Sequence, residues 1–450
     1  MKSHYRRYYK RGLQEINGKV TVFTFRRASI LALIIISLGA LQSLVVHPTL
    51  TAATLFQSSG SIGKNQLSSL ANPVYVRENQ SKTSLTSSLH VEGNQIKTEE
   101  GKLVLLRGWN KGSAGDTNGL IWGKWDMYQQ SEVDLILDKM ASYGANVVRQ
   151  LISVYPWIHN TDVITESGTL TYRQCIDDLL TRAASRGIYV IICPFGIYPK
   201  DCPVHGWGGC EFNDHGPFDP YTTDGHEGVL PNAAAFANFV GSIAEEHGAN
   251  TNLIIEPWNE PFWGYSSDSV VALWQSTWQS CINNIRDAES SNNYVSHLVI
   301  IQHEASLGMY DLDKSWMNFN WYWKYPLNDT AGNLVYSCHI YTQSGKLGTP
   351  KPTSYNDLLT VYRNAKLYDI SAVVPVIIGE IGASLAEDPS GESSFLENSL
   401  RIFNDLEIGF IGWAWWDSGT EYDMIQTNSE LSTGGTVNTN GQLLVDAMNK

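Results

Sequence analysis

From residue 90 onward, the chain alternates between short continuous apolar runs and longer runs with the hydrophobic period of a helix. Short apolar runs rich in β-branched residues predict buried strands, and a period near 3.6 predicts amphipathic helices. Strands are expected at 104–109, 146–154, 189–195, 253–257, 298–303, 335–341, 374–379 and 409–416. Helices are expected at 132–143, 171–186, 232–246, 270–288, 355–367, 393–404 and 443–449.

Strands that alternate with helices are typical of an α/β protein with a parallel sheet. We predict a (β/α)8 TIM barrel over residues 90–450, with loop insertions at its C-terminal face. A doubly wound open sheet is the alternative. No Gly-rich phosphate loop follows the first strand, which argues against a nucleotide-binding version of that sheet. The longest insertion, 196–230, follows the third strand and is expected to shape the active-site face.

The N-terminal segment has a different composition. Residues 1–53 hold eight Lys and Arg and one acidic residue, and they include the uncharged apolar run 28–46. This run is long enough for a membrane span or for a long signal-peptide core, and small residues at 51–53 could form a cleavage site. We therefore expect a signal or anchor segment at 1–53 and a Ser/Asn-rich linker at 54–89. The remainder would be extracellular, either secreted or anchored at the cell surface.

Charge narrows the range of partners. The whole chain has a net charge of −14, and residues 54–450 alone have 23 Lys and Arg against 44 Asp and Glu, which gives −21. So acidic a protein is not expected to bind nucleic acid or anionic lipid, and a neutral polymer suits it better. Aromatic residues make up 11% of the chain. They could serve the core or act as stacking platforms for sugar rings.

The six cysteines suggest one covalent link. Cys202 and Cys210 lie in one loop, where a disulfide is plausible in an extracellular protein. His205 and His215 are near them, so a metal site is conceivable there, but the spacing matches no common zinc pattern. We rank the disulfide higher and expect neither a metal nor a cofactor. The other four cysteines fall within predicted helices or strands and are expected to be buried thiols.

Polar and aromatic residues stand where the predicted strands stop. In a parallel barrel these ends converge at one mouth, where such folds keep their chemistry. The candidate site residues are Arg149 on the second strand, Asn259 and Glu260 on the fourth, His339 and Tyr341 on the sixth, Glu380 on the seventh, and Trp416 on the eighth.

The two glutamates on the fourth and seventh strands would face each other across this mouth. Hydrolysis of a glycosidic bond uses such a pair, with one carboxyl protonated for the leaving oxygen and the other ionised. Arg149 could lower the pKa of the ionised partner, Asn259 could bond the sugar 2-hydroxyl, and Trp416 could form an apolar floor under the ring. Either glutamate alone could be a structural residue, but the two together favour a catalytic function. A further carboxylate, Glu256, is expected to be a pairing partner.

The ordered set of motifs resembles glycoside hydrolase family five, the cellulase family of the retaining (β/α)8 clan. The matching motifs are "LLRGWN", "NVVRQ", "WNEP", "HIY", "IIGEIG" and "WAWW". The resemblance implies that Glu260 is the acid/base and Glu380 the nucleophile. It also implies that Arg149 and Tyr341 orient or bond Glu380, that Asn259 and His339 line the subsite beside the cleaved bond, and that Trp416 stacks there.

One departure from the family concerns the third strand. Many members carry a His pair or an Asp-x-His soon after that strand, whereas this chain reads "CPFGIYP" with no His before His205. The insertion 196–230 is a candidate replacement for that side of the cleft. The resemblance implies a monomeric retaining endo-β-1,4-glycanase that acts on a cellulose-type β-1,4-glucan. A β-1,4-mannanase and a catalytically inactive barrel that only binds polysaccharide are the alternatives.

Overall fold

A computed structural model describes residues 87–111, 127–196, 232–261, 268–302, 319–342, 352–384, 389–416 and 422–450. The predicted signal or anchor segment, nearly all of the linker, and Cys202 with Cys210 lie outside these residues. Across the described ranges, none of the helices combines the length and the apolar character that a membrane span needs.

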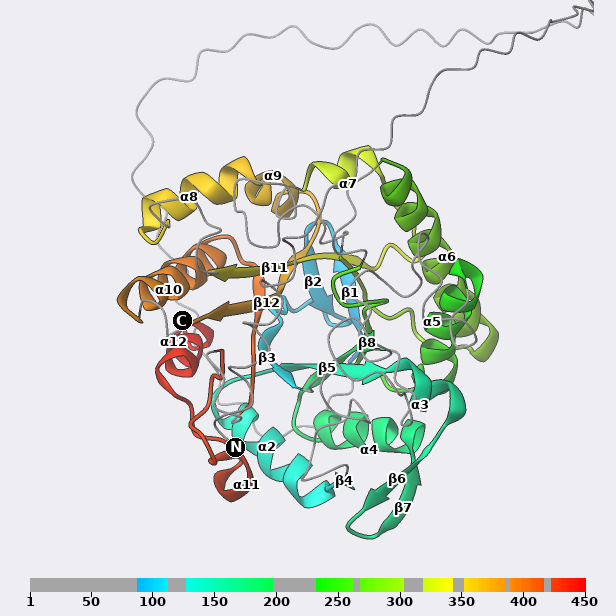
Figure 1. The fold of residues 1–450 in the computed structure, drawn as a ribbon. Helices are drawn as coiled ribbons and strands as arrows, with labels where there is room; N and C mark the ends of the chain where they lie inside the picture. Colours follow the sequence, from blue (N-terminus) through cyan, green and yellow to red (C-terminus); the bar gives the residue numbers. More distant parts are fainter. Residues whose placement is uncertain are drawn as a thin grey trace, which may run out of the picture. The chain divides into compact units, whose positions relative to one another are not determined.

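The centre of the fold is a closed barrel of eight parallel strands, which confirms the predicted (β/α)8 architecture (Figure 1). The neighbours around the barrel follow the order of the chain. The strands are β3 (Arg107–Lys111), β5 (Val147–Ser153), β8 (Tyr189–Gly196), β9 (Leu253–Ile255), β10 (Val299–Gln302), β11 (Leu334–Thr342), β12 (Val376–Ala383) and β13 (Gly409–Gly412).

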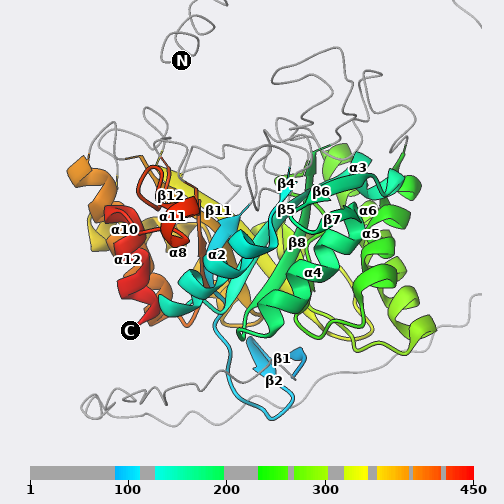
Figure 2. The same ribbon diagram turned by 90° about the horizontal axis from the view of Figure 1, so that it is seen from below.

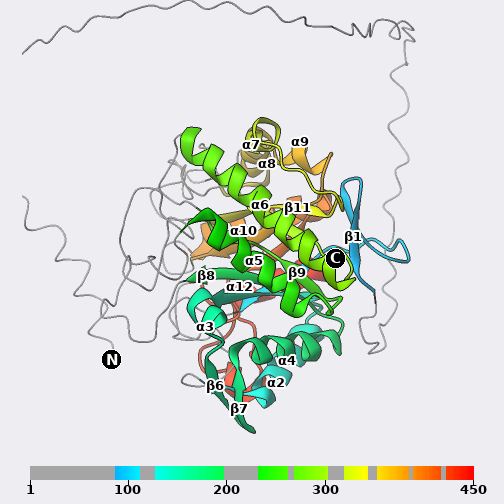
Figure 3. The same ribbon diagram turned by 90° about the vertical axis from the view of Figure 1, so that its right-hand side faces the viewer.

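Helices surround the barrel on its outside (Figures 1 and 3). The longer ones are α2 (Gln130–Ser142), α4 (Tyr172–Ala184), α5 (Ala233–His247), α6 (Asp268–Asn292), α8 (Tyr355–Asn364), α10 (Pro389–Asp405) and α12 (Thr439–Met448). Local sequence fixes several starts. Thr171 and Gln174 form a capping box at α4, and the side chain of Asn232 accepts a hydrogen bond from Ala235 N at α5.

Apolar side chains form two layers, one between the strands and the helices and one inside the barrel. The inner layer contains Val147, Ile254, Val335 and Ile377, which lie near the beginnings of their strands. Because side chains alternate between the two faces of a strand, the residues two positions further along also point inward. The chain places polar residues at several of those later positions, so the barrel is apolar at one end and polar at the other.

Several elements differ from the predicted pattern. A hairpin of β1 (Leu89–Glu92) and β2 (Gln95–Thr98) lies at the end of the barrel where the strands begin (Figure 2). The short strands β4 (Met127–Tyr128), β6 (Asp162–Thr165) and β7 (Gly168–Thr171) form a small separate sheet. The predicted helix 355–367 is interrupted near Lys366, whose φ of 67° lies in the left-handed region. Lys366 is the N-cap of a separate short helix, α9 (Leu367–Ser371).

The remaining short helices are α3 (Val154–His159), α7 (Asn320–Lys324) and α11 (Glu430–Thr433). The eighth barrel strand is shorter than predicted, since it ends at Gly412 and the tryptophan-rich motif follows it.

Candidate active site

A β-bulge turns Glu380 into the barrel. Ile377 points inward and Ile378 outward, so a regular strand would aim residue 380 outward. The pairing of β11 with β12 runs from Cys338–Ile378 to His339–Glu380 and thus skips Gly379. The extra residue reverses the alternation, which re-aims the carboxylate toward the mouth. A Cβ at Gly379 would lie 2.7 Å from Ser337 Oγ and 3.0 Å from His339 Nε2, so glycine suits this position.

Strand β11 supplies two inward groups without any irregularity. Its sequence alternates, with Tyr336, Cys338 and Ile340 in the outer apolar layer, so His339 and Tyr341 point inward. The hydroxyl of Tyr341 donates a hydrogen bond to Glu380 Oε2. Burial and the neighbouring carboxylates raise the pKa of Tyr341 well above its ordinary value, so this hydroxyl stays a donor.

Arg149 is the hub of the site and is fully buried. Its Nη1 donates to Glu380 Oε1 at 2.9 Å, and its Nη2 donates to Asn259 Oδ1 at 2.8 Å. Its Nε and Nη2 bind the two oxygens of Glu256 at 2.6 and 3.1 Å, which confirms that Glu256 is a pairing partner. Burial alone would lower the pKa of Arg149, but the surrounding acidic groups raise it well above its ordinary value. The guanidinium therefore stays charged.

Glu260 approaches from the segment that follows β9. Its φ of 47° lies in the left-handed region, which is uncommon for a residue with a side chain and clusters at functional sites. Its backbone N donates to Gln302 Oε1 at 2.8 Å, which fixes the turn. Its side chain is 18% exposed, whereas that of Glu380 is 5% exposed. Glu260 is thus the more accessible of the two carboxyl groups.

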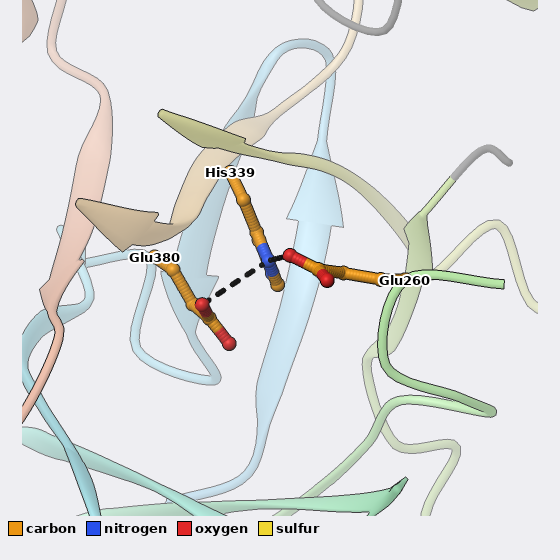
Figure 4. A group of neighbouring side chains, drawn as sticks. All are labelled: Glu260, His339 and Glu380. Carbon is orange, nitrogen blue, oxygen red and sulfur yellow. Dashed lines mark hydrogen bonds and ion pairs between the residues drawn. The ribbon is translucent and has the colours of Figure 1, made fainter. Parts of the chain in front are cut away.

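The carboxyl groups of Glu260 and Glu380 lie on either side of the His339 imidazole (Figure 4). His339 Nδ1 lies 2.8 Å from Glu260 Oε1 and 3.4 Å from Glu380 Oε2. One oxygen of Glu260, one oxygen of Glu380 and the imidazole nitrogen all lie within 4.8 Å of one another. Burial lowers the pKa of His339 to about 4, so the imidazole is neutral near pH 7 and can share one Nδ1 proton with the pair.

The pKa of Glu380 is set by opposing effects, one of which was expected. Arg149 does favour its ionised form, as predicted, and so do His339 and the Tyr341 hydrogen bond. Burial is the larger effect, however, and the pKa of Glu380 is raised above its ordinary value. Arg149, His339 and Tyr341 thus offset part of the effect of burial on Glu380.

The same three residues, Glu260, His339 and Glu380, offer a set of donor atoms close enough to hold a metal ion. The charge of Arg149 at 2.9 Å from Glu380 opposes a second cation there. The arrangement suits a pair of carboxyl groups better than a metal site, with one group able to transfer a proton and the other able to attack a carbon atom.

Trp416 follows the eighth strand and is partly exposed. Its neighbour Trp415 is buried against Trp109, with ring centroids 4.8 Å apart. The backbone N of Trp415 donates to Asn110 O at 3.0 Å, which ties this segment to the first barrel strand. Stacking of Trp416 on a sugar stays a prediction.

Sequence reasoning assigned no role to several residues that surround the site. Asn110 accepts from Arg149 Nη1 at 2.9 Å and donates to the backbone oxygen of Gly379 at 3.0 Å. Cys193 Sγ lies 3.1 Å from Arg149 Nη2, and Gln302 holds the turn at Glu260. Asn110 and Gln302 are polar residues at buried positions of barrel strands, and that placement was the available signal. Cys193 was expected only as a buried thiol.

A barrel that brings two carboxyl groups together at the carboxyl ends of its strands is the arrangement of a glycoside hydrolase. The model of the family "Cellulase (glycosyl hydrolase family 5)" matches residues 100–419. The chain belongs to glycosyl hydrolase family 5, the cellulase family, and is a glycoside hydrolase. A search of curated proteins gives no significant match.

Solved structures agree with this fold. The catalytic domain of the major endoglucanase from Xanthomonas campestris pv. campestris is similar with a TM-score of 0.61 at 14% identity, over 80% of this chain and 99% of that one. An endocellulase from Pyrococcus horikoshii has a TM-score of 0.61 at 18% identity, over 82% and 100%. A mannanase catalytic domain from Streptomyces sp. SirexAA-E has a TM-score of 0.51 at 16% identity, over 84% and 94%. At these identities the likeness establishes the fold.

Proposed function

We propose that the protein is a retaining endo-β-1,4-glucanase that cleaves cellulose-type polysaccharide by double displacement. The observation that carries this proposal is the approach of Glu260 and Glu380 oxygens to within 4.8 Å. Retaining enzymes hold their carboxyl groups about 5–5.5 Å apart, whereas inverting enzymes leave about 6.5–9.5 Å for a water molecule.

The environments of the two groups assign their roles. Glu380 is buried and receives hydrogen bonds from Arg149 and Tyr341, which fix its oxygens and support its negative charge. It is therefore the nucleophile, and its oxygen forms a bond to the anomeric carbon as the glycosidic bond breaks. Glu260 is more accessible, so it can give its proton to the leaving oxygen.

The second displacement uses the same residues in reverse. Glu260, now ionised, takes a proton from a water molecule on the face that the leaving group vacated. The oxygen of that water forms a bond to the anomeric carbon, and Glu380 leaves as a carboxylate. Asn259 accepts a hydrogen bond from Arg149 and directly precedes Glu260, so its amide can bond the sugar 2-hydroxyl, and Trp416 would stack under the ring.

The substrate is proposed to be a β-1,4-glucan because the family is that of the cellulases. Of the three solved structures named above, two are named as an endoglucanase or endocellulase and one as a mannanase, which keeps β-1,4-mannan as the alternative. The net charge of −21 over residues 54–450 also suits a neutral polymer. We further propose an extracellular location, from the basic and apolar N-terminal segment.

A substrate panel tests this proposal. The protein is incubated with hydroxyethyl cellulose, β-mannan and xyloglucan, all of them neutral, and new reducing ends are measured together with the fall in viscosity. We expect the fastest release from the cellulose derivative, with an early fall in viscosity that marks internal cleavage. Faster release from mannan would replace the glucanase with the mannanase alternative. Binding without release from any polymer would mean that the barrel is inactive.

A further inference from the structure

The buried carboxylate Glu256 has no place in the reaction described above, yet it makes the most extensive contact with Arg149. Its two oxygens accept hydrogen bonds from Nε at 2.6 Å and from Nη2 at 3.1 Å. Glu256 is 1% exposed and Arg149 is fully buried. A bidentate pair of this kind fixes both the position and the plane of the guanidinium.

The orientation of the guanidinium plane determines which acceptors the other N–H groups of Arg149 can bind. With one edge held by Glu256, Nη1 is directed to Glu380 Oε1 at 2.9 Å and Nη2 to Asn259 Oδ1 at 2.8 Å. Asn259 directly precedes Glu260 in the chain. A guanidinium that turned by even a small angle would lose one of these contacts, because its donors form a rigid fork.

Charge adds a second effect. Arg149 carries one positive charge and lies between two buried carboxyl groups, Glu256 and Glu380. The negative charge of each carboxylate offsets part of the positive field of Arg149 at the other one. Arg149 therefore stabilises the ionised form of each carboxylate less than it would if the other were absent. Glu256 therefore limits how strongly Arg149 favours the ionised form of Glu380.

From these contacts we infer that Glu256 is a positioning residue for the reaction, which aims Arg149 at the nucleophile and sets how much of its charge the nucleophile receives. This inference rests on the proposed function, because it takes Glu380 as the nucleophile. Glu256 itself would touch no substrate, since it is 1% exposed and both of its oxygens bind Arg149.

Other charged and titratable groups around Glu256 and Glu380 also affect the ionisation of Glu380. These groups have to stay unchanged in a test. The groups that face Glu380 are Arg149 from β5, Glu260 after β9, and His339 and Tyr341 from β11. The groups that face Glu256 are Arg149 and the Cys193 thiol from β8, and Glu256 also acts on His339 through its charge. Burial raises the pKa of Cys193 well above its ordinary value, so this thiol stays neutral.

The test is the pH dependence of kcat/KM for Glu256→Gln with an activated aryl β-cellobioside. The acidic limb of this profile reports ionisation of the nucleophile in the free enzyme. With the charge of Glu256 removed, Arg149 stabilises ionised Glu380 more strongly. We expect the acidic limb to move to lower pH by about 0.5–1 unit. We also expect kcat at the optimum to fall by about 10–100-fold, because an amide accepts only one of the two guanidinium hydrogen bonds and holds Arg149 near its position but less firmly.

Two further variants separate positioning from stability. Glu256→Asp keeps the charge but shortens the reach, so it should lower kcat and leave the acidic limb near that of the wild type. Glu289→Gln is the matched control, because Glu289 is also buried and pairs with Arg286 and His297. It should lower thermal stability and leave the profile in place.

The outcomes are distinguishable. Wild-type protein that cleaves no β-linked substrate would refute the proposed function itself. An active wild type whose acidic limb stays unmoved in Glu256→Gln, or moves to higher pH, would refute the role of Glu256. Should Glu256→Gln fail to fold, Glu256→Asp decides, since unchanged kcat in that variant would also refute it.

Discussion

The variant Glu380→Gln is expected to lose at least ~10³-fold in hydrolysis while it still binds the polysaccharide. The amide has nearly the shape of the carboxylate, and its oxygen can still accept a hydrogen bond from Arg149 or Tyr341. It cannot form the bond to the anomeric carbon, so the first displacement stops. Release of reducing ends measures the loss, and retardation in a gel that contains the polysaccharide measures the binding.

Chemical rescue makes this prediction specific. In Glu380→Ala the space of the side chain is open, and azide can enter and attack the anomeric carbon directly. One displacement then replaces two, so the product should be the glycosyl azide with the inverted configuration. Glu246→Gln serves as the control for loss of a carboxylate, because Glu246 is an exposed residue on α5 that pairs with Arg173. Near-normal activity of Glu380→Gln would remove Glu380 from the nucleophile role.

The variant Glu260→Ala is expected to show a second large loss, which depends on the leaving group. For substrates that leave as a sugar hydroxyl, kcat/KM should fall by about 10²–10⁴-fold, the usual contribution of a general acid. For a dinitrophenyl β-cellobioside, whose leaving group needs no proton, kcat/KM should change far less. The parameter kcat/KM is the appropriate one here because it reports the first displacement. An equal loss for both kinds of substrate would mean that Glu260 is not the proton donor.

The positions where the apolar runs stop predicted much of this site, including Arg149, His339 and Tyr341. The structure adds that His339 and Tyr341 point inward because β11 keeps a regular period of two. Arg149 likewise lies two positions after the inward Val147. Neighbouring strand ends in a closed barrel must converge, so the meeting of these residues followed from the topology.

Other features depend on interactions that a linear pattern does not contain. Strict alternation would turn Glu380 outward, and only the bulge at Gly379 brings it into the site. The left-handed backbone of Glu260 depends on Gln302 from the next strand. The sign of the pKa shift at Glu380 depends on burial that outweighs Arg149, and burial of one side chain is a property of the assembled barrel.

The small sheet of β4, β6 and β7 was missed for a simpler reason. The segment 162–171 reads DVITESGTLT, in which a turn at residues 166–167 beside Gly168 separates two short strands. This hairpin signal was present in the sequence, but only the helix that starts at 171 was predicted there. The predicted disulfide between Cys202 and Cys210 and the insertion 196–230 lie outside the described residues.

The stereochemistry of the first product tests the central claim most directly. With oxygens of Glu260 and Glu380 within 4.8 Å, Glu380 can attack the anomeric carbon without an intervening water. Two inversions follow, so proton NMR of a fresh digest of a β-linked cello-oligosaccharide should show the β-anomer first, before mutarotation supplies the α-anomer. An initial α-anomer would mean that water attacks directly and that Glu380 acts as a base, which would contradict the double-displacement account.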